Sequence, residues 1–171
     1  DTKDYFEFTP GVLRTIVEPK HIKKIQIMHS DYLKKAEIII GKVKEIGEDF
    51  VMANGKKLDF DYLAICAGSS YNAPFKEQNI VIATRAKTLW KNSSDLKNAE
   101  KVLIIGGGLV GVELAGEICW KYPEKKITIV HSAEKLIQRN NEKVIKYAEK
   151  FLKKKGVEII YNERVTENKD R

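Results

Sequence analysis

The sequence predicts an α/β protein, in which a Rossmann-like βαβαβ section follows a β-rich section. Two observations carry this prediction. Strand-like and helix-like runs alternate from Lys101 to Tyr161, which is the order of a parallel sheet joined by crossover helices. Before about residue 78, short β-prone runs are separated by turn residues, a pattern typical of antiparallel strands.

The N-terminal part combines an aromatic stretch with a short helix. The run Tyr-Phe-Glu-Phe-Thr-Pro begins at Tyr5 and leads into a helix that extends to about Arg14. We expect Thr9 to be its N-cap and Pro10 its first residue, because a proline there gives up no helical hydrogen bond. A long β segment is predicted over Ala36–Ile46, around three consecutive isoleucines.

A β-hairpin is predicted around Asn54-Gly55, because this pair favours a tight turn between antiparallel strands. It joins strands at Phe50–Met52 and Lys57–Phe60. Tyr62–Ala67 follows as a buried strand, and Tyr71–Gln78 has the composition of a connection. The domain boundary is therefore predicted between residues 78 and 79.

Beyond this boundary, hydrophobic spacing distinguishes strands from helices. Lys101–Ile105 is almost entirely apolar, as expected of a strand covered on both faces. Asn141–Lys155 repeats apolar residues at helical spacing before Gly156, its expected C-cap. The predicted elements are strands at Ile80–Ile82, Lys101–Ile105, Lys126–Val130 and Val157–Tyr161, and helices at Thr84–Leu96, Leu109–Lys121 and Asn141–Lys155.

A glycine-rich turn follows the strand Lys101–Ile105 directly. Six residues form the pattern G-x-G-x-x-G: Gly106, Gly107, Gly108, Leu109, Val110 and Gly111. Between a strand and a helix, this pattern indicates a dinucleotide site. Gly106 permits the tight turn, Gly108 lets a pyrophosphate approach the backbone, and Gly111 lets helix and strand pack closely. The following helix offers free N–H groups to the anion; the alternative is a glycine-rich turn without a ligand.

Two neighbouring sequence features refine this site. Val112 stands where a Walker P-loop has its lysine, so that class of loop is excluded. Glu113 lies two residues after Gly111. Acidic residues are favoured near helix N-termini by the helix dipole, but a carboxylate beside a pyrophosphate is costly unless it points elsewhere. We therefore predict a role for Glu113 in a redox centre.

The end of the second strand bears on the choice of coenzyme. NAD enzymes usually carry an acidic residue there, which binds the ribose 2′-hydroxyl, whereas this strand ends in Val130-His131-Ser132. Four nearby side chains could contact a 2′-phosphate: His131, Ser132, Lys135 and Arg139. The sequence therefore favours NADPH and leaves NADH open. The alternative is that His131 and Ser132 have no cofactor role.

Composition limits the other classes of function. Lysine and arginine number 31 against 24 acidic residues, giving a net charge of +7. The lysines are spread along the chain, and the run Lys153-Lys154-Lys155 lies on the polar side of a predicted helix, so nucleic-acid binding is disfavoured. No apolar run approaches the roughly 20 residues that span a bilayer. The three histidines lack metal-ligand spacing.

The two cysteines also limit the chemistry. Cys66 and Cys119 are too far apart for a C-x-x-C pair, and each lies in an apolar segment. We therefore expect two buried free thiols, which suits a reducing compartment.

Four segments resemble a known superfamily. The run Gly-Gly-Gly-x-x-Gly-Val-Glu from Gly106 resembles the nicotinamide-binding loop of pyridine nucleotide-disulfide oxidoreductases, which are flavoproteins with two dinucleotide domains. Tyr5–Pro10 resembles a segment of type II NADH dehydrogenases. Tyr62–Ser69 is similar to an Ala-Thr-Gly segment that passes the FAD, although Cys66-Ala67-Gly68 departs from it. Tyr122–Ser132 is similar to ferroptosis suppressor and apoptosis-inducing-factor-like flavoproteins.

The resemblance implies an FAD-dependent NAD(P)H oxidoreductase that passes a hydride from NADPH or NADH to FAD and then reduces a quinone-type acceptor. Residues 1–78 would then be a partial FAD-binding domain, with Pro10, Ala67 and Gly68 near the FAD. Residues 79–171 would be the nicotinamide domain, incomplete at its C-terminus. Glu113 would lie near the redox centre and tune it electrostatically. A peripheral membrane association is compatible with this family.

The resemblance also implies that further FAD-binding segments lie outside Asp1–Arg171, so we expect an internal fragment that is inactive alone. Two alternatives are weighed against this interpretation. Tyr122 and Lys126 spell the Y-x-x-x-K pair of short-chain dehydrogenases, but they follow the third glycine too soon to serve as that pair. A redox-inactive nucleotide sensor or a basic nucleic-acid-binding signalling module remains open.

Overall fold

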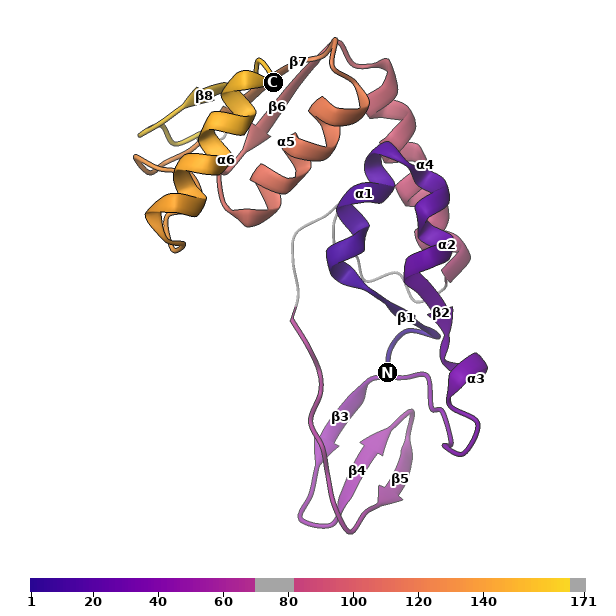
Figure 1. Cartoon of the computed structure of the whole chain (residues 1–171). Coiled ribbons are helices and arrows are strands. Elements are labelled where there is room, and N and C mark those ends of the chain that lie inside the picture. Colours follow the sequence, from indigo (N-terminus) through magenta and orange to yellow (C-terminus); the bar gives the residue numbers. More distant parts are fainter. Residues whose placement is uncertain (70–81, 167–171) are drawn as a thin grey trace. The chain divides into compact units, whose positions relative to one another are not determined.

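The computed structural model describes residues 1–69 and 82–166 and divides the chain into two compact units (Figure 1). The first unit combines Asp1–Val12 with Lys20–Lys91, and the second combines Leu13–Pro19 with Asn92–Arg171. Each unit is therefore built from two separate stretches of sequence. The boundary predicted between residues 78 and 79 lies outside the described residues. So does most of the strand predicted at Ile80–Ile82, although Ile82 itself begins a helix.

The first unit contains two antiparallel sheets. Strand β1 (Tyr5–Glu7) pairs with β2 (Gln26–Met28). Strands β3 (Val43–Ile46), β4 (Phe50–Ala53) and β5 (Lys56–Asp59) form a three-stranded meander. The helical elements of this unit are the 3-10 turn Thr9–Gly11, most of the 3-10 turn Pro19–His21, the single turns α2 (Ile22–Ile25) and α3 (His29–Tyr32), and the first part of α4 (Ile82–Asn98).

The predicted hairpin is confirmed. Phe50 pairs with Asp59 and Ala53 with Lys56, so the turn consists of Asn54 and Gly55. Both residues have positive φ, 52° and 75°. This backbone belongs to a type I′ turn, whose twist matches that of the two strands. Local turn chemistry was therefore sufficient to locate this element.

Two predictions for the N-terminal part are wrong. Phe8, not Thr9, is the N-cap, because the Phe8 carbonyl accepts the N–H of Gly11 (2.9 Å) and so closes the turn one residue earlier. The long strand predicted over Ala36–Ile46 is reduced to β3, since pairing with β4 begins only at Val43.

The buried strand predicted at Tyr62–Ala67 is also wrong. This segment is assigned to no strand, and residues 61–69 are all exposed, Tyr62 at 95%. Among the described residues, no strand pairs with it. Burial would leave its backbone N–H and C=O groups without hydrogen-bond partners, so the segment stays in solvent. Cys66 is therefore exposed, contrary to the expectation of two buried thiols, whereas Cys119 is buried.

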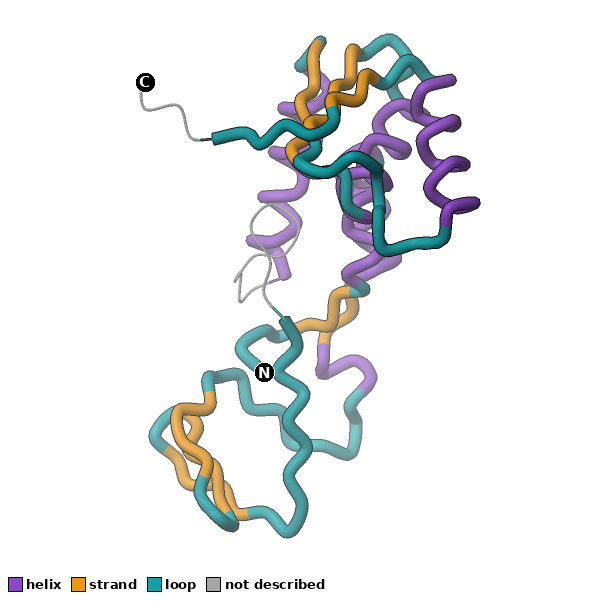
Figure 2. Tube along the Cα trace, turned by 90° about the vertical axis from the view of Figure 1, so that its left-hand side faces the viewer, coloured by secondary structure: helices purple, strands orange, loops and turns teal. Residues whose placement is uncertain are grey.

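The second unit contains the predicted βαβαβ section. Strands β6 (Lys101–Ile105), β7 (Lys126–Val130) and β8 (Glu158–Ile160) form a parallel sheet in that order, and they lie side by side in both views (Figures 1 and 2). Helices α5 (Leu109–Lys121) and α6 (Glu142–Lys154) connect them. The remaining helical elements of this unit are most of α1 (Val12–Val17) and the end of α4.

The ends of α6 show why this helix could be predicted closely. The Asn141 side chain accepts the Val144 N–H (3.0 Å) and caps the first turn. At the other end Gly156 has φ +78°. Its N–H donates to the Lys153 carbonyl, and the Val157 N–H donates to the Leu152 carbonyl (both 3.0 Å). These two bonds form the Schellman motif, in which Lys155 is the C-cap and Gly156 the left-handed residue after it. The predicted end of the helix at Gly156 is confirmed, one residue beyond the C-cap itself.

The core of the second unit lies between the sheet and helices α5 and α6. Ile104, Ile127 and Ile129 project from neighbouring strands toward buried residues of the two helices. On the opposite face of β6, Leu103 and Ile105 are 58% and 65% exposed. The prediction that β6 is covered on both faces is therefore wrong for the described residues, because both crossover helices pack on one side.

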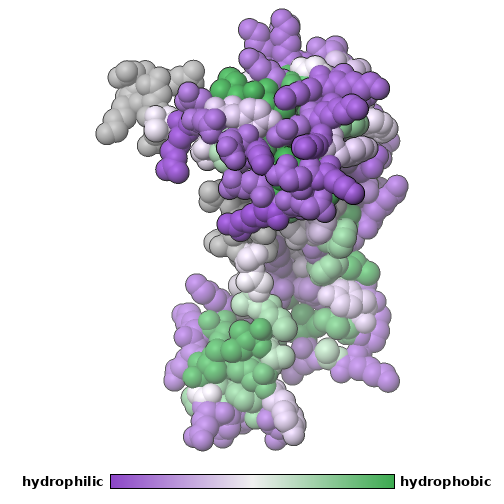
Figure 3. All heavy atoms as spheres, turned by 60° about the vertical axis from the view of Figure 1, so that its left-hand side comes forward, coloured by the Kyte–Doolittle hydropathy of each residue, from purple (hydrophilic) through white to green (hydrophobic). Residues whose placement is uncertain are grey.

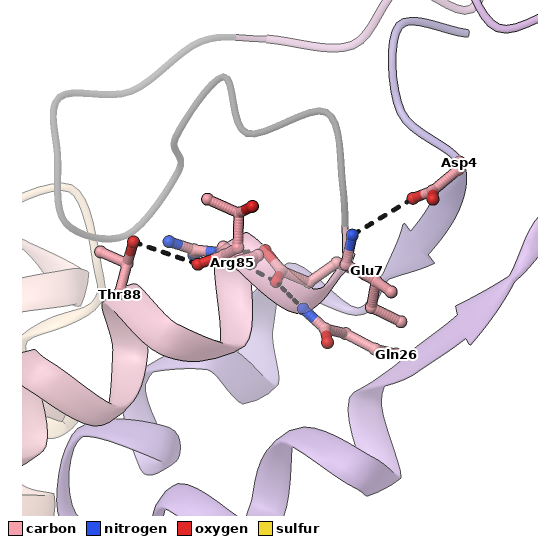
Figure 4. Close-up of polar contacts among 7 residues, drawn as sticks. Asp4, Glu7, Gln26, Arg85 and Thr88 are labelled. Atoms are coloured by element: carbon pink, nitrogen blue, oxygen red, sulfur yellow. Dashed lines mark hydrogen bonds and ion pairs between the residues drawn. The ribbon is translucent and has the colours of Figure 1, made fainter.

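A buried ion pair ties α4 to the first sheet (Figure 4). The side chains of Arg85 and Glu7 are only 1% and 4% exposed. The guanidinium donates to both carboxylate oxygens, at 3.1 and 3.3 Å, and Gln26 donates to the same carboxylate at 2.7 Å. The Glu7 carboxylate thereby joins the helix to β1, and its bond with Gln26 includes β2. The Ile82 N–H adds a bond to the Asp4 carboxylate (3.3 Å).

We predict that Glu7→Gln destabilises the first unit by about 3–5 kcal/mol, because it removes the buried carboxylate that pairs with the Arg85 guanidinium. Urea unfolding followed by circular dichroism measures the loss. Asp59→Asn is the matched control, since the Lys57–Asp59 pair (3.1 Å) is exposed to solvent and screened. Equal changes in the two variants would contradict a special role for the buried pair.

Candidate functional site

The turn after β6 requires glycine at its first position. Gly106 has φ +107°, a conformation that residues with a Cβ rarely adopt. Its N–H donates to the Val130 carbonyl at 2.8 Å, which fixes the turn to the end of β7. The chain then reaches Gly108, the extended N-cap residue of α5.

The third glycine of the pattern brings the helix against the strand. A Cβ on Gly111 would overlap the Gly106 carbonyl oxygen and would lie 3.3 Å from the Ile104 side chain. Only a hydrogen fits between these backbones. This is the close packing of helix and strand that the sequence predicts for Gly111, and it fixes where the first turn of α5 lies.

The space around Gly108 is open. No described atom lies within 4 Å of the position that a Gly108 Cβ would occupy. The adjoining N–H groups of Leu109, Val110 and Gly111 belong to the first turn of α5, where no carbonyl of the same helix is available to them. Free amides beside open space are the arrangement that binds a phosphate at a helix N-terminus.

Gly107 lies in the interior, and the loop after β7 binds both of its backbone polar groups. Its N–H donates to His131 Nδ1 (3.1 Å), and its carbonyl accepts the Ile137 N–H (2.8 Å). A Cβ on Gly107 would overlap the side chain of Leu136 and crowd that of His131. Packing therefore requires glycine at position 107. The pattern G-x-G-x-x-G does not predict this, because it allows any residue there.

The sequence analysis missed Leu136 and Ile137, which support the glycine turn. They are 0% and 6% exposed, within a loop that is otherwise polar. Ile137 has φ +41°, a strained conformation for a β-branched residue. Such strain costs about 1–3 kcal/mol and persists where the surroundings fix the conformation. The signal available in the sequence was an apolar pair inside the polar stretch from His131 to Asn140.

The bond from Gly107 defines the state of the His131 ring. Because the Gly107 N–H is a donor, Nδ1 must be the acceptor, and the neutral ring therefore carries its proton on Nε2. Nε2 is buried and has no hydrogen-bond partner among the described residues. The ring thus supports the turn with one nitrogen and keeps a donor available on the other.

The other candidate contacts for the ribose differ in availability. Lys135 Nζ lies 2.7 Å from Glu142 Oε1. This hydrogen bond and the opposite charges raise the pKa of Lys135 and lower that of Glu142. Ser132 and Arg139 are exposed, and Arg139 forms no ion pair within the described parts of the chain. Ser132 and Arg139 are therefore available to a ligand, whereas Lys135 is already paired.

Glu113 lies on the exposed face of α5. It shares that face with Leu109 and Trp120, four residues before it and seven after it. Its carboxylate forms no hydrogen bond or ion pair with any residue in 1–69 or 82–166. Of the candidates in the first unit, Pro10 and Ala67 are exposed, as is Gly68, which has φ +70°.

Other chemistries find little support in the described residues. They contain no group of three or more His, Cys, Asp or Glu residues placed to hold a metal ion. Burial raises the pKa of the Cys119 thiol, which disfavours a nucleophilic thiolate there. Within 1–69 and 82–166, no helix is both long and apolar enough to cross a bilayer.

A parallel βαβαβ unit with a glycine turn and free amides at the start of its first helix defines a dinucleotide-binding protein of the Rossmann type. Comparison with known proteins gives the family. Residues 3–171 match the family model described as pyridine nucleotide-disulphide oxidoreductase. The chain belongs to this family, whose proteins use FAD and NAD(P)H, and its α/β fold is the predicted one.

Individual relatives agree with this assignment. Apoptosis-inducing factor homolog B of Dictyostelium discoideum is 39% identical over 97% of this chain and 46% of its own length. Ferroptosis suppressor protein 1 of Xenopus tropicalis is 32% identical over 97% and 46%. The chain thus spans less than half the length of these relatives. NDH2 of Plasmodium falciparum, solved in complex with NADH, has a similar fold, with a TM-score of 0.67 at 16% identity over 94% of this chain and 42% of its own.

We predict opposite effects for alanine at two glycines of α5. Gly111→Ala forces its methyl group against the Gly106 carbonyl and should cost about 1–3 kcal/mol. Gly116→Ala enters open space in the same helix and should gain about 0.5–1 kcal/mol from the better helix propensity of alanine. Thermal unfolding measures both. A neutral Gly111→Ala would show that helix and strand do not approach closely.

A second pair of substitutions tests the bond between the two loops. His131→Leu removes the acceptor for the Gly107 N–H, and an unsatisfied buried donor costs about 1–3 kcal/mol. His131→Asn retains an acceptor oxygen and should recover part of the loss. Hydrogen exchange of the Gly107 amide provides the direct measurement. Equal protection of that amide in the original chain and in His131→Leu would contradict the bond.

Proposed function

We propose that this chain is part of an FAD-dependent NAD(P)H oxidoreductase, and that its second unit binds the nicotinamide coenzyme at the glycine turn. The observation that carries this proposal is the open space over Gly108, beside the amides that begin α5. A side chain there would occupy the place of a pyrophosphate. Because the chain belongs to a family that uses NAD(P)H, we interpret the open space over Gly108 as the place of the coenzyme pyrophosphate. We call this space the cradle.

The proposal assigns one cofactor to each of two domains. Residues 79–171 constitute the nicotinamide domain and residues 1–78 part of the FAD domain. Pro10, Ala67 and Gly68 are its proposed FAD contacts, but Ala67 and Gly68 lie in an exposed segment that pairs with no strand of residues 1–69 or 82–166. The described part of the first unit therefore offers FAD no cradle comparable to that at Gly108. We expect the 171-residue chain alone to be inactive.

The coenzyme proposed for the site is NADPH, with NADH as a second substrate. None of the first three residues after β7 carries a carboxylate that could repel a 2′-phosphate or bind a free 2′-hydroxyl. Ser132 and Arg139 are exposed there, whereas Nε2 of His131 is buried. Lys135 could join them only by leaving Glu142. The coenzyme preference therefore depends on few contacts.

The proposed electron acceptor is a quinone-type molecule. When bound, the two cofactors supply the hydride and electron transfer, and this chain binds and orients the coenzyme. Disulfide chemistry is disfavoured because the two cysteines of this chain, Cys66 and Cys119, do not form a C-x-x-C pair. The resemblance to type II NADH dehydrogenases and ferroptosis suppressor proteins favours a quinone. Glu113, exposed and without a partner in the described regions, is the group proposed to tune the redox centre.

Anaerobic stopped-flow reduction of the flavin in the full-length protein tests these roles together. Gly108→Val should raise the NADPH concentration at half-maximal rate at least about 10-fold, because its side chain enters the open space where the pyrophosphate would lie. It should lower stability by only about 1 kcal/mol, since valine is a poorer N-cap than glycine. Glu113→Gln should lower the limiting rate and leave half-saturation unchanged. Gly116→Ala on the same helix is the control for both.

Two results would contradict the proposal. Unchanged NADPH dependence in Gly108→Val would remove the glycine turn from the coenzyme site. Unchanged limiting rates in Glu113→Gln would remove Glu113 from the redox centre. Repeating the titration with NADH measures the coenzyme preference, and equal half-saturation by the two coenzymes would show that the end of β7 does not discriminate between them.

A further inference from the structure

Helix α6 has a buried face and a strongly basic outer face. Ile145 and Leu152 are 3% and 1% exposed and belong to the core. At helical spacing, the opposite side carries a group of exposed lysines: Lys143, Lys146, Lys150, Lys153 and Lys154. Figure 3 brings forward the side of Figure 1 on which α6 lies, and the surface of the second unit there is predominantly hydrophilic.

The acidic residues of α6 do not neutralise this face. Glu142 pairs with Lys135, and Glu149 accepts the Leu136 N–H at 3.3 Å. In the described parts of the chain, Lys143, Lys146, Lys150 and Lys154 form no ion pair. Residues 142–155 contain six lysines and two glutamates, so this short stretch carries +4 of the chain's net charge of +7.

The spacing of these lysines is unfavourable for the helix itself. Lys146 and Lys150 are four residues apart, as are Lys150 and Lys154. Like charges at this spacing repel each other and lower helix stability. Nothing in the fold of the second unit requires them, because the core contacts come from the opposite face. Their concentration is therefore better explained by an anionic partner than by folding.

Apolar side chains border the lysines along one edge. Tyr147 is 74% exposed, and Val144 and Phe151, three residues before it and four after it, are partly exposed. An exposed aromatic ring beside lysines suits the headgroup region of a membrane, where apolar and charged groups meet. Residues 142–155 contain no arginine, the side chain that most often reads nucleic-acid bases. The combination favours a lipid surface over nucleic acid.

We propose that the outer face of α6, defined by the five lysines with Tyr147 and Phe151, docks onto a bilayer that contains anionic phospholipids. The helix lies along the membrane surface, and its buried face stays in the core of the second unit, so docking requires no unfolding. The lysines provide attraction that salt screens, and Tyr147 enters the headgroup layer. This surface is separate from the glycine turn and does not depend on the proposed enzymatic function.

Sedimentation of the full-length protein with vesicles tests the proposal. Vesicles of phosphatidylcholine with about 30% phosphatidylserine should bind the protein, and vesicles of phosphatidylcholine alone should bind it far less. The triple substitution Lys146→Gln, Lys150→Gln, Lys154→Gln should weaken binding about 100-fold, since each lysine near an anionic surface contributes about fivefold. Glutamine preserves helix propensity, so the fold should be unaffected.

The matched control removes three exposed lysines from the first unit, by Lys23→Gln, Lys44→Gln and Lys56→Gln. It changes the net charge equally and should retain binding. Tyr147→Ser should weaken binding severalfold at constant charge. Equal binding by the α6 variant and the control, or no preference for phosphatidylserine in the original protein, would overturn the proposal. Loss of duplex DNA binding in the α6 variant, with vesicle binding intact, would replace the membrane by nucleic acid as the partner.

Discussion

The absence of a side chain at Gly111 is the constraint on which the second unit depends. Because its backbone meets the Gly106 carbonyl with no room for a methyl group, the first turn of α5 is held directly against the end of β6. The free amides of that turn therefore lie beside the open space at Gly108. The proposed anion site therefore depends first on a packing requirement between helix and strand, before any ligand-binding side chain is considered.

The loop after β7 fixes this turn from its other side. Through His131 and Ile137 it satisfies both backbone polar groups of Gly107, and Leu136 occupies the place that a Gly107 side chain would need. The left-handed backbone of Ile137 is the cost of this arrangement. The turn therefore has its binding conformation before a ligand arrives. This reduces the conformational entropy that the loop would otherwise lose when a ligand binds.

The contrast between predicted and observed elements follows from how local each signal is. The bounds of the strands and helices from Lys101 onward were predicted within a few residues. Caps, turns and hydrophobic spacing depend on residues that are close together in the sequence. Tyr62–Ala67 has the composition of a strand but no described partner, and composition cannot supply one. The Arg85–Glu7 pair and the bond from Gly107 to His131 join residues 78 and 24 positions apart, which a single sequence does not reveal.

The division of the chain also affects how the protein is made. Leu13–Pro19 belongs to the second unit, and Val17 lies in the same core as Ile127 and Val157. A ribosome releases α1 more than a hundred residues before those partners exist, so the second unit cannot fold progressively behind the exit tunnel. During this interval the apolar side chains of α1 remain exposed to solvent. We therefore expect chaperone binding to limit aggregation of the nascent chain.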